Sequence, residues 1–180
     1  IDFVTLSAVA KALGKKVEEL LLVEDWNAPD RLSFDDFIDD RLRGFVGREF
    51  VFQAMEAFMK RYESGYFLIE GKPGMGKSAF LAKLVRERNY QAHHFNLSTS
   101  GINTPGHFIR NICARIALQR HLPQPEMPPG FDQDSLALDN ALRQAASTLA
   151  GTDQLVLVID ALDEVDMGRA SPMANVLFLP

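Results

Sequence analysis

One short stretch of the sequence, residues 71–78, has the residue types and the spacing of a phosphate-binding loop. It reads GKPGMGKS and matches G-x-x-x-x-G-K-[ST] at every fixed position. Glycines let the backbone approach phosphate oxygens and adopt positive φ, and the amides of the loop and of the following helix point together at an anion. We therefore expect Lys77 to reach the β- and γ-phosphates of a nucleotide and the Ser78 hydroxyl to ligate Mg²⁺. The predicted nucleotide contacts in this stretch are Gly71, Lys72, Pro73, Gly74, Met75, Gly76, Lys77, Ser78 and Ala79.

An apolar run that ends in acids supplies the second group of candidate residues. Residues 155–159 are LVLVI, and they are followed by Asp160 and then, within one turn, by Asp163 and Glu164. Such a run is typical of a parallel strand covered on both faces, and its carboxyl end is where open α/β sheets bind ligands. We expect Asp160 to hold Mg²⁺ together with Ser78, and Asp163 or Glu164 to position or activate the attacking water. The alternative is an acid-rich helix N-terminus favoured by the helix dipole.

Alternating strands and helices would bring these two groups to the same edge of a sheet. The apolar run before the loop predicts a strand, and turn residues separate the later segments. An apolar stripe predicts a helix that starts after residue 49 and ends at Ser64 and Gly65. The other predicted elements are strands over residues 66–70, about 90–97 and 155–160, and helices over residues 77–88, about 105–120 and 133–150. Parallel strands alternating with helices define an α/β fold.

Three further side chains with metal-binding chemistry are predicted to be structural. His93 and His94 are adjacent in the predicted second strand, so they point to opposite faces and are not expected to share a metal ion. Cys113 lies on the apolar face of the helix predicted over about residues 105–120, where it is most simply a core residue.

The composition is that of an ordinary globular domain. The chain has 180 residues, 47% hydrophobic and 24% charged, which suits one domain and a small appendage. The net charge of −5 gives no global sign of nucleic-acid binding, and a single cysteine fits a reducing compartment. No apolar run approaches the ~20 residues that span a bilayer. We therefore expect a cytoplasmic protein without a membrane partner. Because the sequence starts without Met and stops within an apolar segment, we interpret it as part of a longer protein.

We divide the sequence into three predicted segments. Residues 1–23 are predicted to be helical, residues 24–44 an acidic linker, and residues 45–180 the N-terminal part of the nucleotide-binding domain. Residues 24–40 hold seven acids against one arginine, which is typical of a solvated segment. The segment also contains apolar side chains that could dock as a short helix, namely Phe34, Phe37 and Ile38.

Residues 6–22, LSAVAKALGKKVEELLL, resemble the last helices of Xre/Cro-type helix-turn-helix domains. The resemblance implies DNA as a candidate partner, contacted through a recognition helix upstream of this sequence. An amphipathic helical hairpin without that function gives the same pattern.

Most of the chain resembles the STAND-type signalling ATPases, and among them the NACHT-like bacterial members. The phosphate loop and the block over residues 155–164, which ends DALDE, carry the resemblance as a specific pair. Residues 45–49, FVGRE, are similar to the FxGRE motif that lies against the adenine in this family. The segment from His94 to Arg110 is similar to the region after the second strand, and this similarity is weaker.

The resemblance implies the following site and fold. Val46, Gly47 and Arg48 would border the adenine of ATP or ADP. The nucleotide would set a switch, with ADP in the resting form and ATP permitting self-association and output. The fold would be an α/β P-loop NTPase, a three-layer α/β/α sandwich whose parallel sheet has the strand order 5-1-4-3-2. The fourth strand and the lid would follow residue 180, so we expect an incomplete sheet and a chain that binds ATP weakly by itself.

Two other functions stay open at the level of sequence. One is a DNA-binding transcriptional regulator in which the ATPase is an assembly device, which depends on the sequence upstream of residue 6. The other is a general P-loop ATPase or phosphotransferase. Asp163 and Glu164 favour water over a bound hydroxyl as the acceptor.

Overall fold

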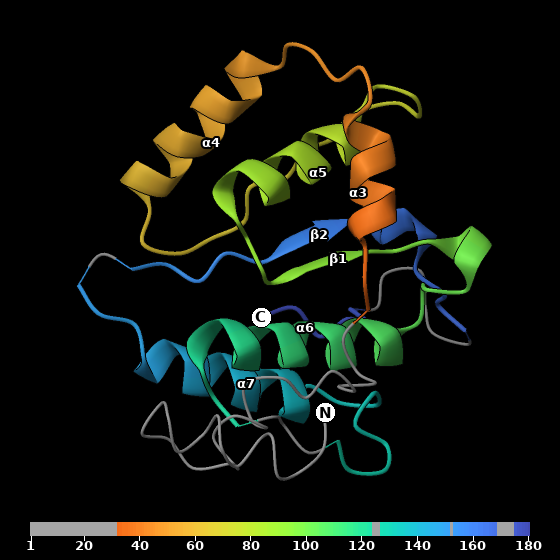
Figure 1. The fold of residues 1–180 in the computed structure, drawn as a ribbon. Helices are drawn as coiled ribbons and strands as arrows, with labels where there is room; N and C mark the ends of the chain where they lie inside the picture. The colour runs from red at the N-terminus through yellow and green to blue at the C-terminus, as the bar shows by residue number, and fades with distance from the viewer. Residues whose placement is uncertain (1–31, 124–126, 152, 169–174) are drawn as a thin grey trace, which may run out of the picture.

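The computed structural model describes residues 32–123, 127–151, 153–168 and 175–180. The helical segment predicted at residues 1–23 therefore lies outside the described residues. Figure 1 shows the elements, which in chain order are α3 (Asp35–Leu42), α4 (Glu49–Arg61), α5 (Lys77–Arg88), β1 (His93–Phe95), the 3-10 helix η1 (Ser98–Ser100), α6 (Pro105–Arg120), α7 (Leu136–Ser147), β2 (Val158–Asp160) and the 3-10 helix η2 (Leu162–Glu164). Among the described residues, no helix is both long enough and apolar enough to cross a membrane.

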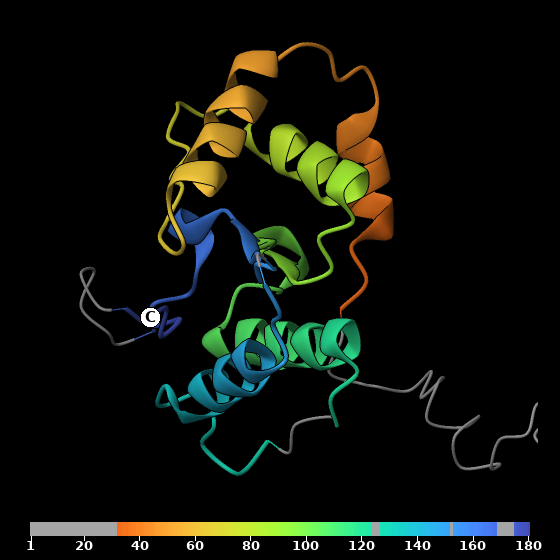
Figure 2. The same cartoon turned by 90° about the vertical axis from the view of Figure 1, so that its left-hand side faces the viewer.

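The two strands form a small parallel sheet with helices on both faces. β1 pairs with β2 in a register that sets Phe95 against Asp160. Helices α3, α4 and α5 lie on one side of the strands, and α6 and α7 lie on the other, as the views in Figures 1 and 2 agree. The second and third predicted strands are thus parallel neighbours within an α/β arrangement, although both are shorter than the apolar patterns indicated.

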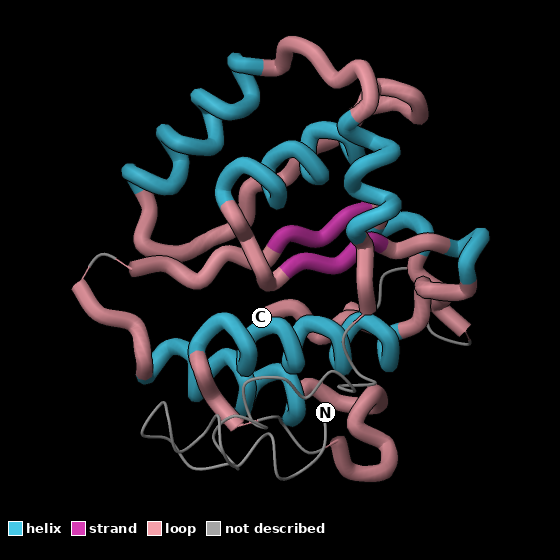
Figure 3. Tube along the Cα trace, viewed as in Figure 1, coloured by secondary structure: helices cyan, strands magenta, loops and turns pink. Residues whose placement is uncertain are grey.

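The predicted strand over residues 66–70 is wrong for this structure. The segment carries no strand hydrogen bonds and is drawn as loop in Figure 3. Tyr66 is 64% exposed and Leu68 is 67% exposed. A strand exists through its partners, because each of its N–H and C=O groups needs a hydrogen bond. Within the described residues the sheet contains β1 and β2 alone, so this apolar segment has no neighbour with which to form a ladder.

Two hydrophobic clusters lie on opposite faces of the sheet. One lies between the sheet and helices α6 and α7, and its fully buried members include Phe108, Ile112 and Leu138. Cys113 belongs to this cluster and is fully buried, as predicted. Burial raises the pKa of its thiol to about 12, so it behaves as a small apolar side chain. The other cluster joins α3 and α5 to the sheet.

The described part of the acidic segment is packed against the domain and is not a solvated linker. α3 places Phe34 and Ile38 in the second cluster, where each is 2% exposed. The acids lie on its other side, and Asp39 pairs with Arg86 of α5 at 2.5 Å. The apolar side chains noted in the sequence therefore decide the structure of residues 34–42, because their burial outweighs the tendency of the acids to stay in water.

Candidate nucleotide site

The phosphate loop forms a tight turn that leads directly into α5. Gly74 and Gly76 adopt left-handed φ values of 79° and 80°, which a residue with a side chain adopts only with strain. The amide of Met75 donates to the carbonyl of Lys72 at 3.2 Å and closes the turn. Gly76 is the N-cap of α5, so the unpaired amides of the first helical turn and those of the loop lie together. This is the local geometry that binds phosphate.

Two cationic side chains fold onto carbonyls of this loop. Lys77 Nζ donates to the carbonyl of Gly71 at 2.7 Å, and Arg48 Nη2 donates to the carbonyl of Met75 at 2.8 Å. Arg48 is the N-cap of α4 and has a left-handed φ of 75°. The FVGRE motif and the phosphate loop, which are 27 residues apart, are thereby joined. Two positive charges at the loop complement the negative charge of a nucleotide.

The predicted adenine contacts lie beside this junction. Val46 is 84% exposed, and Gly47 has a left-handed φ of 77° that turns the chain into α4. Met75 is also exposed, so apolar surface is open to a ligand next to Arg48. Their contacts with a base stay predictions.

The structure brings Ser78 and Asp160 together from α5 and β2. Asp160 is 4% exposed, and the Ser78 side chain lies close enough to its carboxylate to influence its pKa. Burial raises the pKa of Asp160, while Ser78 and the amide of Ala161 act against this rise, as does the charge of Lys77. Ala161 takes a left-handed φ of 52°, and its amide faces the same carboxylate.

The oxygen atoms of the Ser78 hydroxyl and the Asp160 carboxylate fit Mg²⁺ as ligands. A hydroxyl and a carboxylate are the oxygen ligands that a hard cation prefers. A buried carboxylate with a raised pKa has less charge compensation than it would have in water, so a bound cation would stabilise its ionised form. Ser78 and Asp160 would hold the ion, and this assignment stays a prediction.

The two acids after Asp160 are placed differently from each other. Both lie in η2 and are exposed. The Glu164 carboxylate accepts hydrogen bonds from the backbone amide and the hydroxyl of Ser98, at 3.2 Å and 2.8 Å. Asp163 makes no such contact among the described residues. Glu164 is therefore tied to the segment after β1 through its Oε2 atom.

Sequence reasoning missed two residues that support this site. Ser98 binds Glu164, and Asn96 binds the strand that carries Asp160: its Nδ2 donates to the Asp160 carbonyl at 2.8 Å. Asn96 is 1% exposed. A polar residue at the end of an apolar strand was the signal available, because such a residue is buried only when hydrogen-bonded.

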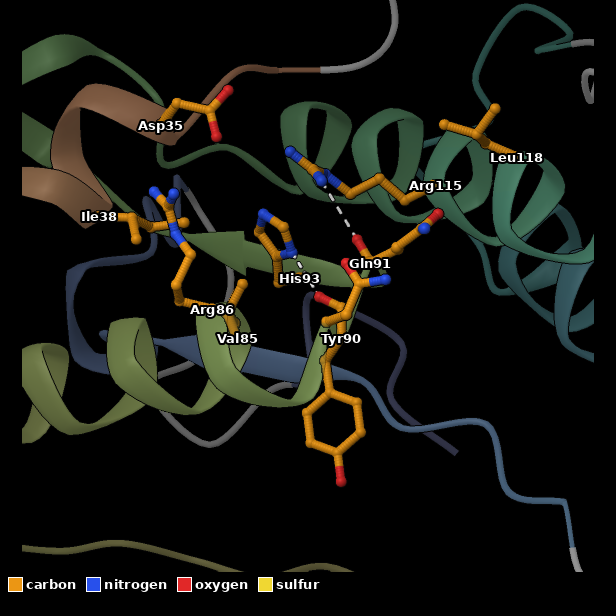
Figure 4. A pocket seen from close by; sticks show the side chains of 10 residues that line it. Asp35, Ile38, Val85, Arg86, Tyr90, Gln91, His93, Arg115 and Leu118 are labelled. Atoms are coloured by element: carbon orange, nitrogen blue, oxygen red, sulfur yellow. Dashed lines mark hydrogen bonds between the residues drawn. The ribbon is translucent and has the colours of Figure 1, made fainter. Parts of the chain in front are cut away.

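A cavity of about 340 Å³ lies between α3, α5 and α6, and none of its lining residues belongs to the phosphate loop (Figure 4). His93 Nδ1 donates to the carbonyl of Tyr90 at 2.7 Å, and Arg115 Nη1 donates to the carbonyl of Gln91 at 3.1 Å. Both side chains thus secure the turn that leads into β1. Within the described residues, no group of three His, Cys, Asp or Glu side chains has the geometry of a metal site.

The loop, the pair formed by Ser78 and the buried Asp160, and the parallel strands covered by helices define a P-loop α/β domain. The chain belongs to the AAA ATPase domain family, whose family model matches residues 44–177. No curated protein and no solved structure matches it. Membership makes the chain a P-loop ATPase domain that binds nucleotide, and such domains typically use Mg²⁺. The matched range excludes the segment that resembles a helix-turn-helix.

Proposed function

We propose that this chain is the nucleotide-binding part of a STAND-type molecular switch of the NACHT-like kind, in which ATP and ADP control self-association and output. The proposal rests on the two motifs that resemble this family, and one observation carries it. Arg48, which begins α4, donates to the carbonyl of Met75 inside the phosphate loop. One helix of the domain is therefore held by the loop that receives the phosphates.

A nucleotide would change this hold. A hydrogen bond from a guanidinium to a phosphate is stronger than one to a neutral carbonyl, so phosphates in the loop compete for Arg48 and for Lys77. α4 also packs on α5, through Phe52 and Phe80 with ring centroids 4.6 Å apart. The position of α4 would then report whether the loop is filled and how many phosphates it holds.

The contact of Glu164 supports slow hydrolysis. Lys77 would bind the β- and γ-phosphates, Ser78 and Asp160 would hold Mg²⁺, and Mg²⁺ would neutralise charge on the phosphate oxygens. Glu164 would position the attacking water with Oε1, while Ser98 donates two hydrogen bonds to Oε2 and restrains the carboxylate. A resting state that keeps Glu164 on Ser98 suits a switch, which must retain its nucleotide for longer than a rapid enzyme does.

The proposal is tested by nucleotide binding and by hydrogen exchange of α4. Lys77→Ala should abolish binding of both ATP and ADP. In the parent chain, ATP and ADP should give different exchange rates for the amides of α4, and Arg48→Lys should reduce that difference because lysine cannot reproduce the planar fork of arginine. Identical exchange of α4 and an identical molecular mass with ATP and with ADP would refute the switch, even if binding itself is intact.

A further inference from the structure

A run of buried polar side chains connects the segment before α3 to the strand that ends at Asp160. It passes from α6 through β1 to β2 and consists of Arg115, Asn111, His94 and Asn96, which are 8%, 0%, 0% and 1% exposed. Buried polar groups are retained where they are hydrogen-bonded, because an unpaired one destabilises the fold. We therefore expect each polar atom of these four side chains to have a hydrogen-bond partner.

The first half of the run has a fixed direction. Asn111 Oδ1 accepts from Arg115 Nε at 2.9 Å and from the amide of Leu32 at 3.0 Å. Both partners can only donate, so the orientation of the Asn111 amide is determined. Its Nδ2 therefore donates, to the carbonyl of His93 at 2.8 Å and to His94 Nδ1 at 3.1 Å. Arg115 Nη2 also donates to the Leu32 carbonyl at 2.6 Å, so both backbone groups of Leu32 are held.

These bonds decide the tautomer of His94. Its Nδ1 accepts a hydrogen bond, so in the neutral ring the proton resides on Nε2. Burial and the charge of Arg115 lower the pKa of His94 to about 3, which keeps the ring neutral at physiological pH. His94 Nε2 is thus a buried donor, and no acceptor among the described residues meets it with regular hydrogen-bond geometry.

The second half of the run is fixed by Asp160. Asn96 donates to the Asp160 carbonyl from Nδ2 at 2.8 Å and from its backbone amide at 3.4 Å. A carbonyl can only accept, so Asn96 Oδ1 is the other end of that amide, and within the described part of the chain it is buried without a hydrogen-bond partner. The Asn96 side chain interacts with His94. One donor and one acceptor are therefore left over on two interacting buried side chains.

The geometry points to a hydrogen bond from His94 Nε2–H to Asn96 Oδ1, which closes one directional relay from Leu32 to the carbonyl of Asp160. His94 and Asn96 are then positioning residues for Asp160 in Mg²⁺ binding, a role that rests on the proposed metal site. Within the described residues β2 pairs with β1 alone, and Asn96 adds the last bonds at the end where Asp160 lies. If the Asn96 side chain moved away, the Asp160 carbonyl would lose the hydrogen bond that Asn96 Nδ2 donates to it.

Imidazole nitrogen NMR on the chain without nucleotide tests the pairing directly. We expect His94 to carry its proton on Nε2, and we expect the Nε2–H signal to shift in Asn96→Leu. The competing acceptor is His107 Nδ1, which is also buried, has no hydrogen-bond partner in the part of the chain that the structure describes, and is close enough to affect His94. A proton on Nδ1, or a signal that moves in His107→Leu and stays in Asn96→Leu, would overturn the pairing.

Binding of ADP with and without Mg²⁺ tests the positioning role. His94→Gln keeps an N–H at the ε position, whereas His94→Asn keeps polar atoms at the δ position and loses the donor to Asn96. We expect the gain in ADP affinity caused by Mg²⁺ to fall by about tenfold in His94→Asn and Asn96→Leu, in the range for residues that orient metal ligands. His94→Gln should retain it, as should Cys113→Ala, which opens a cavity in α6 outside the relay.

Equal Mg²⁺ dependence in all four variants would refute the positioning role and leave the proposed function untouched. A parent chain whose ADP binding shows no dependence on Mg²⁺ would refute the metal site and the positioning role together. The tautomer and the Nε2–H signal would still decide whether the hydrogen bond exists.

Discussion

Acidification should destabilise this chain through one buried histidine. His94 is fully buried, and its pKa is lowered from 6.5 to about 3, first by loss of water and then by the charge of Arg115. In the unfolded chain the ring takes up a proton near its ordinary pKa. The unfolded state therefore binds more protons than the folded state between these two values, so stability is lost as pH falls through about 6.5 and continues to fall toward about 3.

The size of the effect follows from the two pKa values. Near pH 5 almost every unfolded chain has a protonated His94 and almost no folded chain has one. Linkage then gives a loss of about 2 kcal/mol of unfolding free energy between about pH 7.5 and about pH 5. Asp160 acts in the opposite sense, because its raised pKa lets the folded state keep a proton that the unfolded state releases. A comparison with a variant at position 94 cancels the contribution of Asp160.

The assay is urea unfolding of the parent and of His94→Gln at both pH values. Gln cannot be protonated, so the variant should lose about 2 kcal/mol less than the parent on acidification. The matched control is His121→Asn, which replaces an exposed histidine at the end of α6 with a residue that tolerates its left-handed φ of 54°. Parallel pH profiles for the parent and His94→Gln would refute the reasoning, whatever their absolute stabilities.

Two further predictions concern the nucleotide site. Glu164→Gln should preserve ATP binding and slow hydrolysis by about a hundredfold, the lower range for loss of a general base; Asp163→Asn is the matched control, and the reverse order of rates would assign the role to Asp163. The chain should bind ATP more weakly than micromolar and have a low free energy of unfolding, because residues 66–70 have no strand partner among the described residues and Leu68 is 67% exposed. A high free energy of unfolding together with micromolar ATP affinity would contradict this second prediction.

Local patterns in the sequence predicted the parts of the fold that local physics decides. α5 runs over Lys77–Arg88 and α6 over Pro105–Arg120, as the apolar spacing and the turn residues indicated. A local cap begins α6: Pro105 follows Thr104, whose hydroxyl accepts from the amide of His107 at 3.2 Å. These features depend on residues within a few positions of each other, so one sequence is enough to find them.

The features that the sequence did not predict depend on contacts between residues that are far apart in the chain. Ser98 and Glu164 are 66 residues apart, and Leu32 and Arg115 are 83 apart. No spacing rule connects such pairs, because their meeting depends on how the helices pack across the sheet. The same limit applies to residues 66–70: the apolar pattern fits a strand, but a strand also needs a neighbour, and the sequence pattern does not show whether that neighbour is present.

Ser78 and Asp160 lie near each other even though residues 66–70 pair with no strand among the described residues. Ser78 is carried by α5, and α5 packs directly on the sheet through Phe80, which shares a buried cluster with Val158 of β2. The helix side of the loop is therefore fixed by core packing, independently of the segment that leads into it.

The other side of the loop begins at Gly71 and is held by the Lys77 side chain, which a phosphate would draw away. Nucleotide binding would thus remove a restraint that keeps the start of the loop in place, and a strand paired with residues 66–70 would supply it instead. We therefore expect affinity for ATP to depend more on the order of residues 66–71 than on the Ser78–Asp160 pair, which is already assembled.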